Sequence, residues 1–257
     1  MRMKTILSAI FGIFISLSTG ISFAQGENAA EIVNGCFRYM RGDTSFSRVI
    51  MTIHKPRWER TMSINGWTKG EKDSIFWISD PPKDRGNGTL KKDREMWMYN
   101  PKVNRVIKLP PSMMTQAWMG SDFSNNDLAK TDSLVNDYIH TITGYDEHEG
   151  RKVFIIKSMP KPGAPVIWGM QVLKIREDHI FLSQEFFDEA FQSVKALTTH
   201  EIGMHGGKNY PVLWKMRKTD VQDEYTLLKY TDITFDIDIP DGFFSVSSLK
   251  NPARHGL

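Results

Sequence analysis

Apolar residues recur at two different spacings along the chain. Between residues 29 and 41 they stand three or four positions apart, which predicts an amphipathic helix that ends at Gly42. From Phe46 onward the spacing changes to two, which is typical of a half-buried strand. The chain is therefore expected to begin with one helix and to continue as a long series of strands.

The predicted strands fall into two groups, on either side of residues 110–136. They cover residues 46–53, 58–68, 75–78, 96–99 and 103–109 in the first group, and 138–147, 151–159, 167–176, 180–188, 194–204, 210–218 and 225–235 in the second. Short turns between neighbouring strands imply antiparallel pairing. The expected fold class is mainly β, an incomplete (open) antiparallel barrel of about 11–13 strands whose concave face is covered by helices.

Residues 110–136 interrupt the strand pattern. Pro110 and Pro111 stop a strand, and the apolar residues from Met113 to Trp118 fit one short amphipathic helix. The stretch 121–128 is rich in residues that cap helices, with Ser121 or Asp122 expected to begin the next one. A last short helix is expected at residues 243–249.

The first 24 residues have the pattern of a secretory signal peptide. Two positive charges precede an apolar run at 6–17, and Ser22 and Ala24 supply small residues before Gln25. The alternative is an uncleaved anchor, but the run is about a dozen residues long, whereas a spanning helix needs roughly 20. We expect cleavage after Ala24 and a single exported domain over residues 25–257.

Charge and cysteine content narrow the choice of function. The formal charge is +3, and removing Arg2 and Lys4 leaves 31 basic against 30 acidic residues, or about +1. Such a balance gives no general attraction to nucleic acid. The basic run 91–94 is expected to be a solvated hairpin end. Cys36 is the single cysteine, so no intramolecular disulfide can form, and its place on the apolar helix face predicts a buried thiol.

Motifs for metal binding or catalysis are incomplete in this sequence. His200 and His205 stand five residues apart, whereas the zinc-peptidase pattern requires four. The acidic stretch 236–242 lacks the spacing and the final glutamate of a calcium loop. Glu185 and Asp188 could do acid–base chemistry, but an exposed strand face is the simpler interpretation. We expect no metal, no cofactor and no catalytic residue.

Soft apolar side chains are the most distinctive feature of the chain. It contains seven tryptophans, and twelve of its fourteen methionines lie beyond the predicted signal peptide. Methionine-rich surfaces accommodate variable apolar partners. The densest group is Met113, Met114, Trp118 and Met119, in the region that interrupts the strands. Spacing alone leaves open whether this region is a fixed part of the core or a movable lid.

The same region resembles the outer membrane lipoprotein-sorting protein family, the LolA-like group. The resemblance rests on Trp118-Met119-Gly120-Ser121-Asp122-Phe123-Ser124-x-x-Asp127-Leu128, on Trp77, Pro81 and Arg85-Gly86, on Trp97-x-Tyr99-x-Pro101 and Arg105, and on Ile239-Pro240-Asp241-x-Phe243-Phe244 with Leu249. It spans about residues 30–250. Asn125 and Asn126 depart from it, because the family often has an aromatic residue and a glutamate there.

The resemblance implies a half-barrel that carries acyl chains through the periplasm or senses lipidated molecules there. The candidate cavity or lid residues are Met51, Trp77, Trp97, Met113, Met114, Trp118, Met119, Phe123 and Trp168. The candidate structural residues of the motif are Arg105, Gly120, Ser121, Asp122 and Asp127, with Asp122 expected to pair with Arg105.

We expect a non-enzymatic periplasmic carrier of lipid or lipoprotein acyl chains, in lipoprotein sorting or in transporter-linked lipid traffic. Expected partners are an inner-membrane transporter of the resistance-nodulation-division class or an outer-membrane acceptor, and not nucleic acid. Two alternatives stay open. One is an envelope sensor or scaffold that uses the same half-barrel for protein contacts, and the other is a periplasmic hydrolase that uses His179, His200 or nearby carboxylates.

Overall fold

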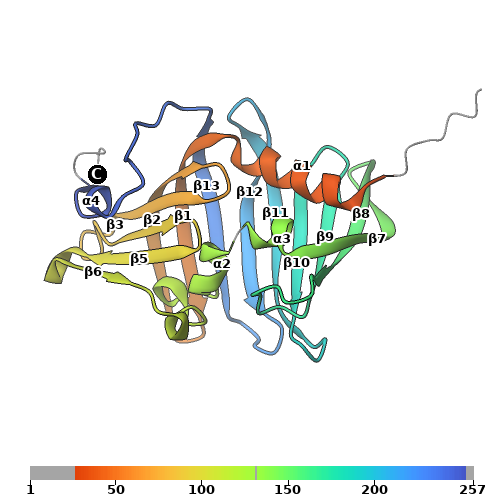
Figure 1. Cartoon of the computed structure of the whole chain (residues 1–257), viewed down its shortest axis with the longest axis horizontal. Helices are drawn as coiled ribbons and strands as arrows, with labels where there is room; N and C mark the ends of the chain where they lie inside the picture. The colour runs from red at the N-terminus through yellow and green to blue at the C-terminus, as the bar shows by residue number, and fades with distance from the viewer. Residues whose placement is uncertain (1–26, 131, 253–257) are drawn as a thin grey trace, which may run out of the picture.

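The computed structural model describes residues 27–130 and 132–252, so the predicted signal peptide lies outside the described residues. Over these residues the chain forms one antiparallel sheet of thirteen strands, in the order β6-β5-β4-β3-β2-β1-β13-β12-β11-β10-β9-β8-β7. The sheet curves without closing, with β6 and β7 at its two edges (Figure 1). The prediction of a mainly β, open antiparallel barrel is confirmed.

Two meanders make up this sheet. The first comprises β1 (Thr44–Lys55), β2 (Trp58–Lys69), β3 (Asp73–Asp80), β4 (Gly88–Lys92), β5 (Glu95–Asn100) and β6 (Arg105–Lys108). The second comprises β7 (Tyr138–His148), β8 (Arg151–Pro160), β9 (Met170–Arg176), β10 (Phe181–Phe187), β11 (Ser193–His205), β12 (Lys208–Lys218) and β13 (Tyr225–Phe235). They meet where β1 pairs with β13, from Ser45 opposite Phe235 to His54 opposite Tyr225.

One connection joins the two edges of the sheet. We call residues 109–137 the crossing segment, because it leaves β6 at one edge and enters β7 at the other across the concave face (Figure 1). Its regular structure consists of the 3₁₀ turns η2 (Pro111–Met113) and η3 (Trp118–Gly120) and the helices α2 (Asn125–Ala129) and α3 (Ser133–Asn136). The segment that covers the sheet therefore also links its halves.

The first helix, α1 (Ala29–Arg41), has the predicted bounds. The Asn28 side chain caps its start, and Gly42 ends it with a φ of 62°, a left-handed conformation that glycine adopts without a steric penalty. The helix lies across strands of the second meander on the concave side (Figure 1). Its buried residues, Ala29, Val33, Cys36 and Met40, belong to the main apolar core.

The crossing segment differs from its prediction in two respects. Residues 113–118 do not form one helix, because the chain there makes two separate 3₁₀ turns, and Met119 has a φ of 53°. Neither Ser121 nor Asp122 caps the next helix. That cap is Ser124, whose hydroxyl accepts the backbone N–H of Asp127 at 3.2 Å while the Asp127 carboxylate accepts the Ser124 N–H at 2.7 Å.

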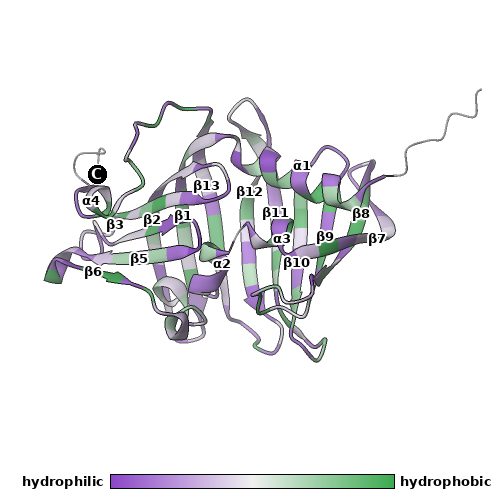
Figure 2. Ribbon diagram, in the orientation of Figure 1, coloured by the Kyte–Doolittle hydropathy of each residue, from purple (hydrophilic) through white to green (hydrophobic). Residues whose placement is uncertain are grey.

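Hydrophilic and hydrophobic residues alternate along many strands (Figure 2). In β3, β4 and β5, residues are buried on both faces of the sheet. In β3, Ile78 belongs to the concave core and Phe76 packs against it, whereas Ile75 and Trp77 point to the convex side. A C-terminal segment, residues 236–252, covers that convex side and includes α4 (Val246–Leu249). Its apolar residues there are Ile239, Phe243, Phe244 and Leu249.

The basic run 91–94 is not wholly a solvated hairpin end. The Lys91 side chain is only 1% exposed and donates to the Asp132 carboxylate at 3.0 Å and to the Glu71 carbonyl at 2.7 Å. β4 is short and its inward positions face the crossing segment, so this lysine is buried beneath it. The prediction is wrong for Lys91, while Lys92, Asp93 and Arg94 are exposed.

Candidate functional site

A cavity of about 340 Å³ lies between the concave face of the sheet, α1 and the crossing segment. This volume falls within the range of small-molecule binding sites, roughly 300–1,000 Å³. Most of the surface that lines it is apolar. The apolar wall includes Val33, Phe37 and Met40 of α1, Leu173, Ile175, Phe181, Phe186, Leu197, Trp214 and Met216 of the second meander, and Trp118, Phe123 and Leu128 of the crossing segment.

Part of the hollow lies where the first meander presents small side chains toward larger ones of the second. Ser45 and Ser47 of β1 and Gly66 and Thr68 of β2 line the cavity at the end nearest α1. A Cβ atom added to Gly66 would lie 2.7 Å from the Phe76 ring. Gly66 therefore accommodates the Phe76 ring, whereas Ser45, Ser47 and Thr68 leave space that larger apolar residues would fill.

The predicted cavity residues separate into three groups. Trp118, Phe123 and Trp168 line the cavity, and so does Asp127 from the structural group. A neighbouring cluster on the concave side contains Met51, Met113, Met114 and Met119. Trp77 and Trp97 lie on the convex side, where the Trp77 indole donates to the Leu249 carbonyl at 3.1 Å. The crossing segment and the 166–168 loop thus bring the first group together, and the tryptophans of β3 and β5 face away from it.

The sequence motif 118–128 fixes the shape of the crossing segment. The Trp118 indole donates to Thr89 Oγ1 at 3.0 Å, and the Ser121 hydroxyl donates to the Trp118 carbonyl at 2.7 Å. Gly120 between them has a φ of 79°, which favours glycine. The tight turn is held at both ends, so Trp118 is fixed over the cavity.

Asp122 does not pair with Arg105, contrary to expectation. Its Oδ1 lies 2.8 Å from the Lys55 ammonium, and its Oδ2 accepts the Thr226 hydroxyl at 2.7 Å. Arg105 is exposed at the start of the edge strand β6. Burial lowers the pKa of Lys55, but its hydrogen bonds to Asp122 and Glu224 outweigh burial and raise that pKa overall.

Asp122 is the first of four aspartates, spaced five residues apart, that attach the crossing segment to the sheet. The four ion pairs are Asp122 with Lys55 of β1, Asp127 with Lys195 of β11, Asp132 with Lys91 of β4 at 3.0 Å, and Asp137 with Arg94 at 3.4 Å. The first three are largely buried, whereas Arg94 is exposed. The segment is thus held to both meanders by charge.

One of these pairs lies at the cavity wall. Lys195 is buried with Asp127, and its ammonium stands 5.0 Å from the Trp168 ring and 5.2 Å from the Phe186 ring. Because each charge faces its partner, the pair adds little net charge to the cavity. Nearby, burial raises the pKa of Tyr138 to about 12, and burial raises that of the Cys36 thiol to about 12, so both stay neutral at physiological pH.

Sequence reasoning missed three features of the cavity: Lys195, the Tyr210–Tyr230 pair and Arg41. The two tyrosine rings lie 5.2 Å apart in an edge-on arrangement on β12 and β13. Arg41 and Lys195 could have been found from their positions, because each is a charge at a place where the apolar pattern points inward. Arg41 follows Phe37 by one helical turn, and Lys195 precedes Leu197 on the same strand face.

The histidine and acidic motifs stay apart in the fold. Over residues 27–130 and 132–252, no three His, Cys, Asp or Glu side chains gather so as to hold a metal ion. His200 lies on β11 beside Thr198, with its Nε2 3.0 Å from that hydroxyl, and His179 packs under Gly35 of α1. In the same described part of the chain, every helix is too short or too polar to cross a membrane.

Comparison with known proteins supports this architecture. A family model described as "Uncharacterized protein" matches residues 70–251. A DUF1329 family protein from Desulfovibrio piger has 21% sequence identity and a TM-score of 0.77, over 86% of this chain and 97% of that one. A LolA superfamily protein from Nitrosomonas europaea has 20% identity and a TM-score of 0.72, over 86% and 99%.

A domain from Vibrio parahaemolyticus, classed with outer membrane lipoprotein-sorting proteins, has 19% identity and a TM-score of 0.73, over 86% of this chain and 98% of that one. The comparison with curated proteins found no match. At these identities the likeness establishes the fold, which is LolA-like, as the sequence resemblance implied.

Proposed function

The chain belongs to the family whose model matches residues 70–251, and from its LolA-like fold and its cavity we propose that it binds and carries the acyl chains of lipids or lipoproteins. The observation that carries this proposal is the apolar cavity of about 340 Å³. A well-packed domain leaves few voids larger than a water molecule. An apolar hollow of this size, between a sheet and its covers, is therefore suited to a guest.

The energetics favour an acyl chain as that guest. Each methylene removed from water contributes about 0.8 kcal/mol, so a long chain gains several kcal/mol in such a cavity. Trp118, Phe123 and Trp168 supply aromatic surface to the cavity. The role of these side chains as ligand contacts is part of the proposal.

The proposed carrier works without catalysis and in the periplasm. The predicted signal peptide supports export, and the Vibrio relative in fold, classed with lipoprotein sorting, supports a role in envelope lipid traffic. An inner-membrane transporter or an outer-membrane acceptor would supply or receive the acyl chain. The crossing segment and α1 would shield the chain from water during transfer.

Two measurements test the proposal. Protein purified without detergent is examined by native mass spectrometry, with a co-purified lipid mass as the expected result. Delipidated protein is then titrated with the uncharged methyl ester of dibromostearic acid, whose bromine atoms quench nearby tryptophans. We expect saturable quenching, because Trp118, Trp168 and Trp214 line the cavity.

A matched pair of variants tests whether the bound acyl chain lies in the cavity. Ser47→Leu fills the cavity from β1 and is expected to weaken ester binding about tenfold, or 1.4 kcal/mol. Arg48→Leu changes the adjacent, outward-pointing position of the same strand and is expected to leave binding unchanged. Absence of saturable quenching, or equal effects of the two variants, would contradict the carrier. An empty protein would instead favour the envelope sensor or scaffold.

A further inference from the structure

The cavity has a polar corner at the C-terminal end of α1. Arg41, the last residue of α1, lines the cavity there together with Ser45, Ser47 and Thr68. The hydroxyls of Ser45 and Thr68 lie 2.7 Å apart across the β1–β2 pair. This corner combines a permanent positive charge with hydroxyl groups in a cavity whose lining is mostly apolar.

The Arg41 guanidinium is only partly satisfied by the protein. Its Nε donates to the Gly70 carbonyl at 3.0 Å, and one Nη donates to the Asp73 carbonyl at a longer 3.5 Å. The Phe37 ring lies 5.6 Å from its centre. A guanidinium has five N–H donors, so three are left over from these two bonds.

No carboxylate among the described residues forms an ion pair with Arg41. The nearby acids are already engaged, since Asp132 accepts from Lys91 at 3.0 Å and Glu71 accepts from Asn136 at 3.1 Å. Burial lowers the pKa of Arg41, against the opposing influence of Tyr230, Tyr210 and these acids. The Arg41 guanidinium is thus partly removed from water without a direct counter-ion. This arrangement costs free energy unless a bound anion pairs with the guanidinium.

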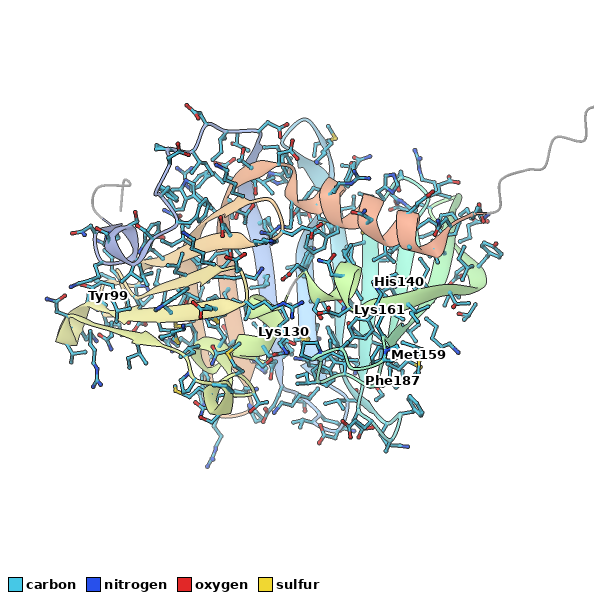
Figure 3. All side chains as sticks on the ribbon, viewed as in Figure 1. Tyr99, Lys130, His140, Met159, Lys161 and Phe187 are labelled. Atoms are coloured by element: carbon cyan, nitrogen blue, oxygen red, sulfur yellow. The ribbon has the colours of Figure 1, made fainter. Side chains whose placement is uncertain are left out.

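The other cations at the cavity differ from Arg41. Lys195 is neutralised by Asp127. Lys130, in the link between α2 and α3, donates to the Pro165 carbonyl in the exposed 161–168 loop (Figure 3). Arginine is also the better match for an oxyanion, because its planar fork can donate two parallel hydrogen bonds.

We propose that the Arg41 corner binds the oxyanion head of an amphiphile, a carboxylate or a phosphate, whose acyl chain fills the adjoining cavity. This inference rests on the proposed acyl-chain function and adds the chemical class of the guest. The guanidinium and the Ser45 and Thr68 hydroxyls supply donors to the head, and the apolar wall takes the chain. Neutral esters and alcohols would bind by the chain alone.

The test compares the head groups of otherwise identical probes. Dibromostearate and its methyl ester are titrated separately, at pH 8 and below their aggregation concentrations, into delipidated protein, with tryptophan quenching as the readout. We expect the anion to bind about tenfold more tightly than the ester. Arg41→Gln should abolish that preference by lowering the affinity for the anion to that for the ester, and saturable binding of the ester shows that the variant is folded. Arg41→Lys should retain part of the preference for the anion over the ester.

Two control variants locate the effect. Arg38→Gln removes the same charge from an exposed position one turn earlier in α1 and should keep the full preference. Lys130→Gln should also keep it. If Lys130→Gln removes the preference instead, the head group lies at the other end of the cavity and the inference is wrong.

The remaining outcomes separate this inference from the carrier function. Equal binding of anion and ester by the unmodified protein overturns the head-group site while the carrier stands. Failure of both probes to bind overturns the carrier itself. Inorganic phosphate is added as a competitor: loss of the anion preference only at high millimolar phosphate supports an amphiphile site, whereas loss at micromolar phosphate identifies a site for the free ion and overturns the inference.

Discussion

The concave face has two covers that are held in different ways. α1 is a regular amphipathic helix whose buried residues pack into the main apolar core, and none of its residues forms an ion pair within the described part of the chain. The crossing segment has little regular structure and is attached by four aspartates to Lys55, Lys195, Lys91 and Arg94. Buried apolar surface holds α1, whereas the crossing segment combines apolar contacts with specific ion pairs.

This difference matters because the two kinds of attachment respond differently to change. Apolar burial is non-directional and is lost in proportion to the surface removed. A buried ion pair depends on both partners, because removing one leaves an uncompensated charge. Single substitutions in α1 should therefore reduce the stability of the protein by small amounts. Single substitutions of the paired aspartates should detach the crossing segment from the sheet.

The largest effect is expected from Asp127→Ala. It leaves the Lys195 ammonium buried beside Trp168 and Phe186 without its carboxylate, and it removes the cap partner of Ser124. Breaking one side of a buried pair costs about 3–5 kcal/mol. Urea unfolding measures the loss.

The exposed pair of Arg48 with Asp232 provides the control. Asp232→Ala is expected to cost less than about 1 kcal/mol, because solvent screens that pair. If Asp127→Ala costs no more than Asp232→Ala, the crossing segment is not held by its charges.

Asp122→Ala should have a smaller effect than Asp127→Ala. Lys55 loses one carboxylate at 2.8 Å but keeps Glu224 at 2.7 Å, and Thr226 loses its acceptor. A loss of about 2 kcal/mol is expected for hydrogen bonds to a charged group. Thermal unfolding gives the stability, and amide hydrogen exchange over 118–130 should be faster. An unchanged melting temperature together with unchanged ester binding would refute this role.

For α1, Val33→Ala should reduce stability by about 1.5 kcal/mol, at about 0.8 kcal/mol per methyl group removed from the core. Arg38→Ala, on the exposed side of the same helix, should change stability by less than about 0.5 kcal/mol. Urea midpoints of the two variants measure the difference. A collapse of the fold in Val33→Ala would mean that α1 is no more tolerant than the crossing segment.

The smallest expected effect is a pH dependence of stability that arises from His140, near the end of the crossing segment. His140 of β7 lies 2.8 Å from the Ser158 hydroxyl, and burial lowers its pKa below 6.5, against the opposing influence of the Leu134 backbone. The unfolded chain therefore takes up this proton at a higher pH than the folded one. Stability should fall as pH drops from about 6.5 toward the lower folded pKa.

His140→Gln should flatten that part of the pH profile, measured by urea unfolding at successive pH values. His205→Gln, at the end of β11, is the matched control and should retain the slope. An identical slope in both variants would assign the pH dependence to other groups.

The sequence predicted the parts of the fold that local pattern determines. The bounds of α1 match because its apolar spacing, its cap residue and Gly42 agree with one another. Most strands match within a few residues because alternation and turn residues mark them. β4 escaped separate prediction because Gly88 to Lys92 is buried throughout except at its last residue, so it shows no alternation.

The crossing segment could not be predicted in the same way, because its structure depends on distant residues. Asp122 and Lys55 are 67 residues apart, and Asp127 and Lys195 are 68 apart. Aspartate spacing gives no indication of which lysine each one meets. The misassigned partner of Asp122 and the burial of Lys91 share this cause.

The candidate site was predicted in part. The signature that carries the family resemblance placed Trp118 and Phe123 near the cavity, because that turn is built from neighbouring residues. Trp77 and Trp97 were misplaced because β3 and β5 have apolar residues on both faces, and alternation cannot say which face is concave. Arg41 was missed because a basic residue in the last turn of a helix also suits the helix dipole.

The route of the crossing segment limits how the cavity can open. Its two ends are continuous with β6 and β7, the opposite edges of the sheet. A strap fastened at both ends cannot swing aside as a one-hinged flap does. It can only bow outward or slide, and the slack available for either motion is set by how far apart the two edges stand. A flatter sheet would move β6 and β7 apart and extend the crossing segment. The curvature of the sheet and access to the cavity are therefore mechanically linked.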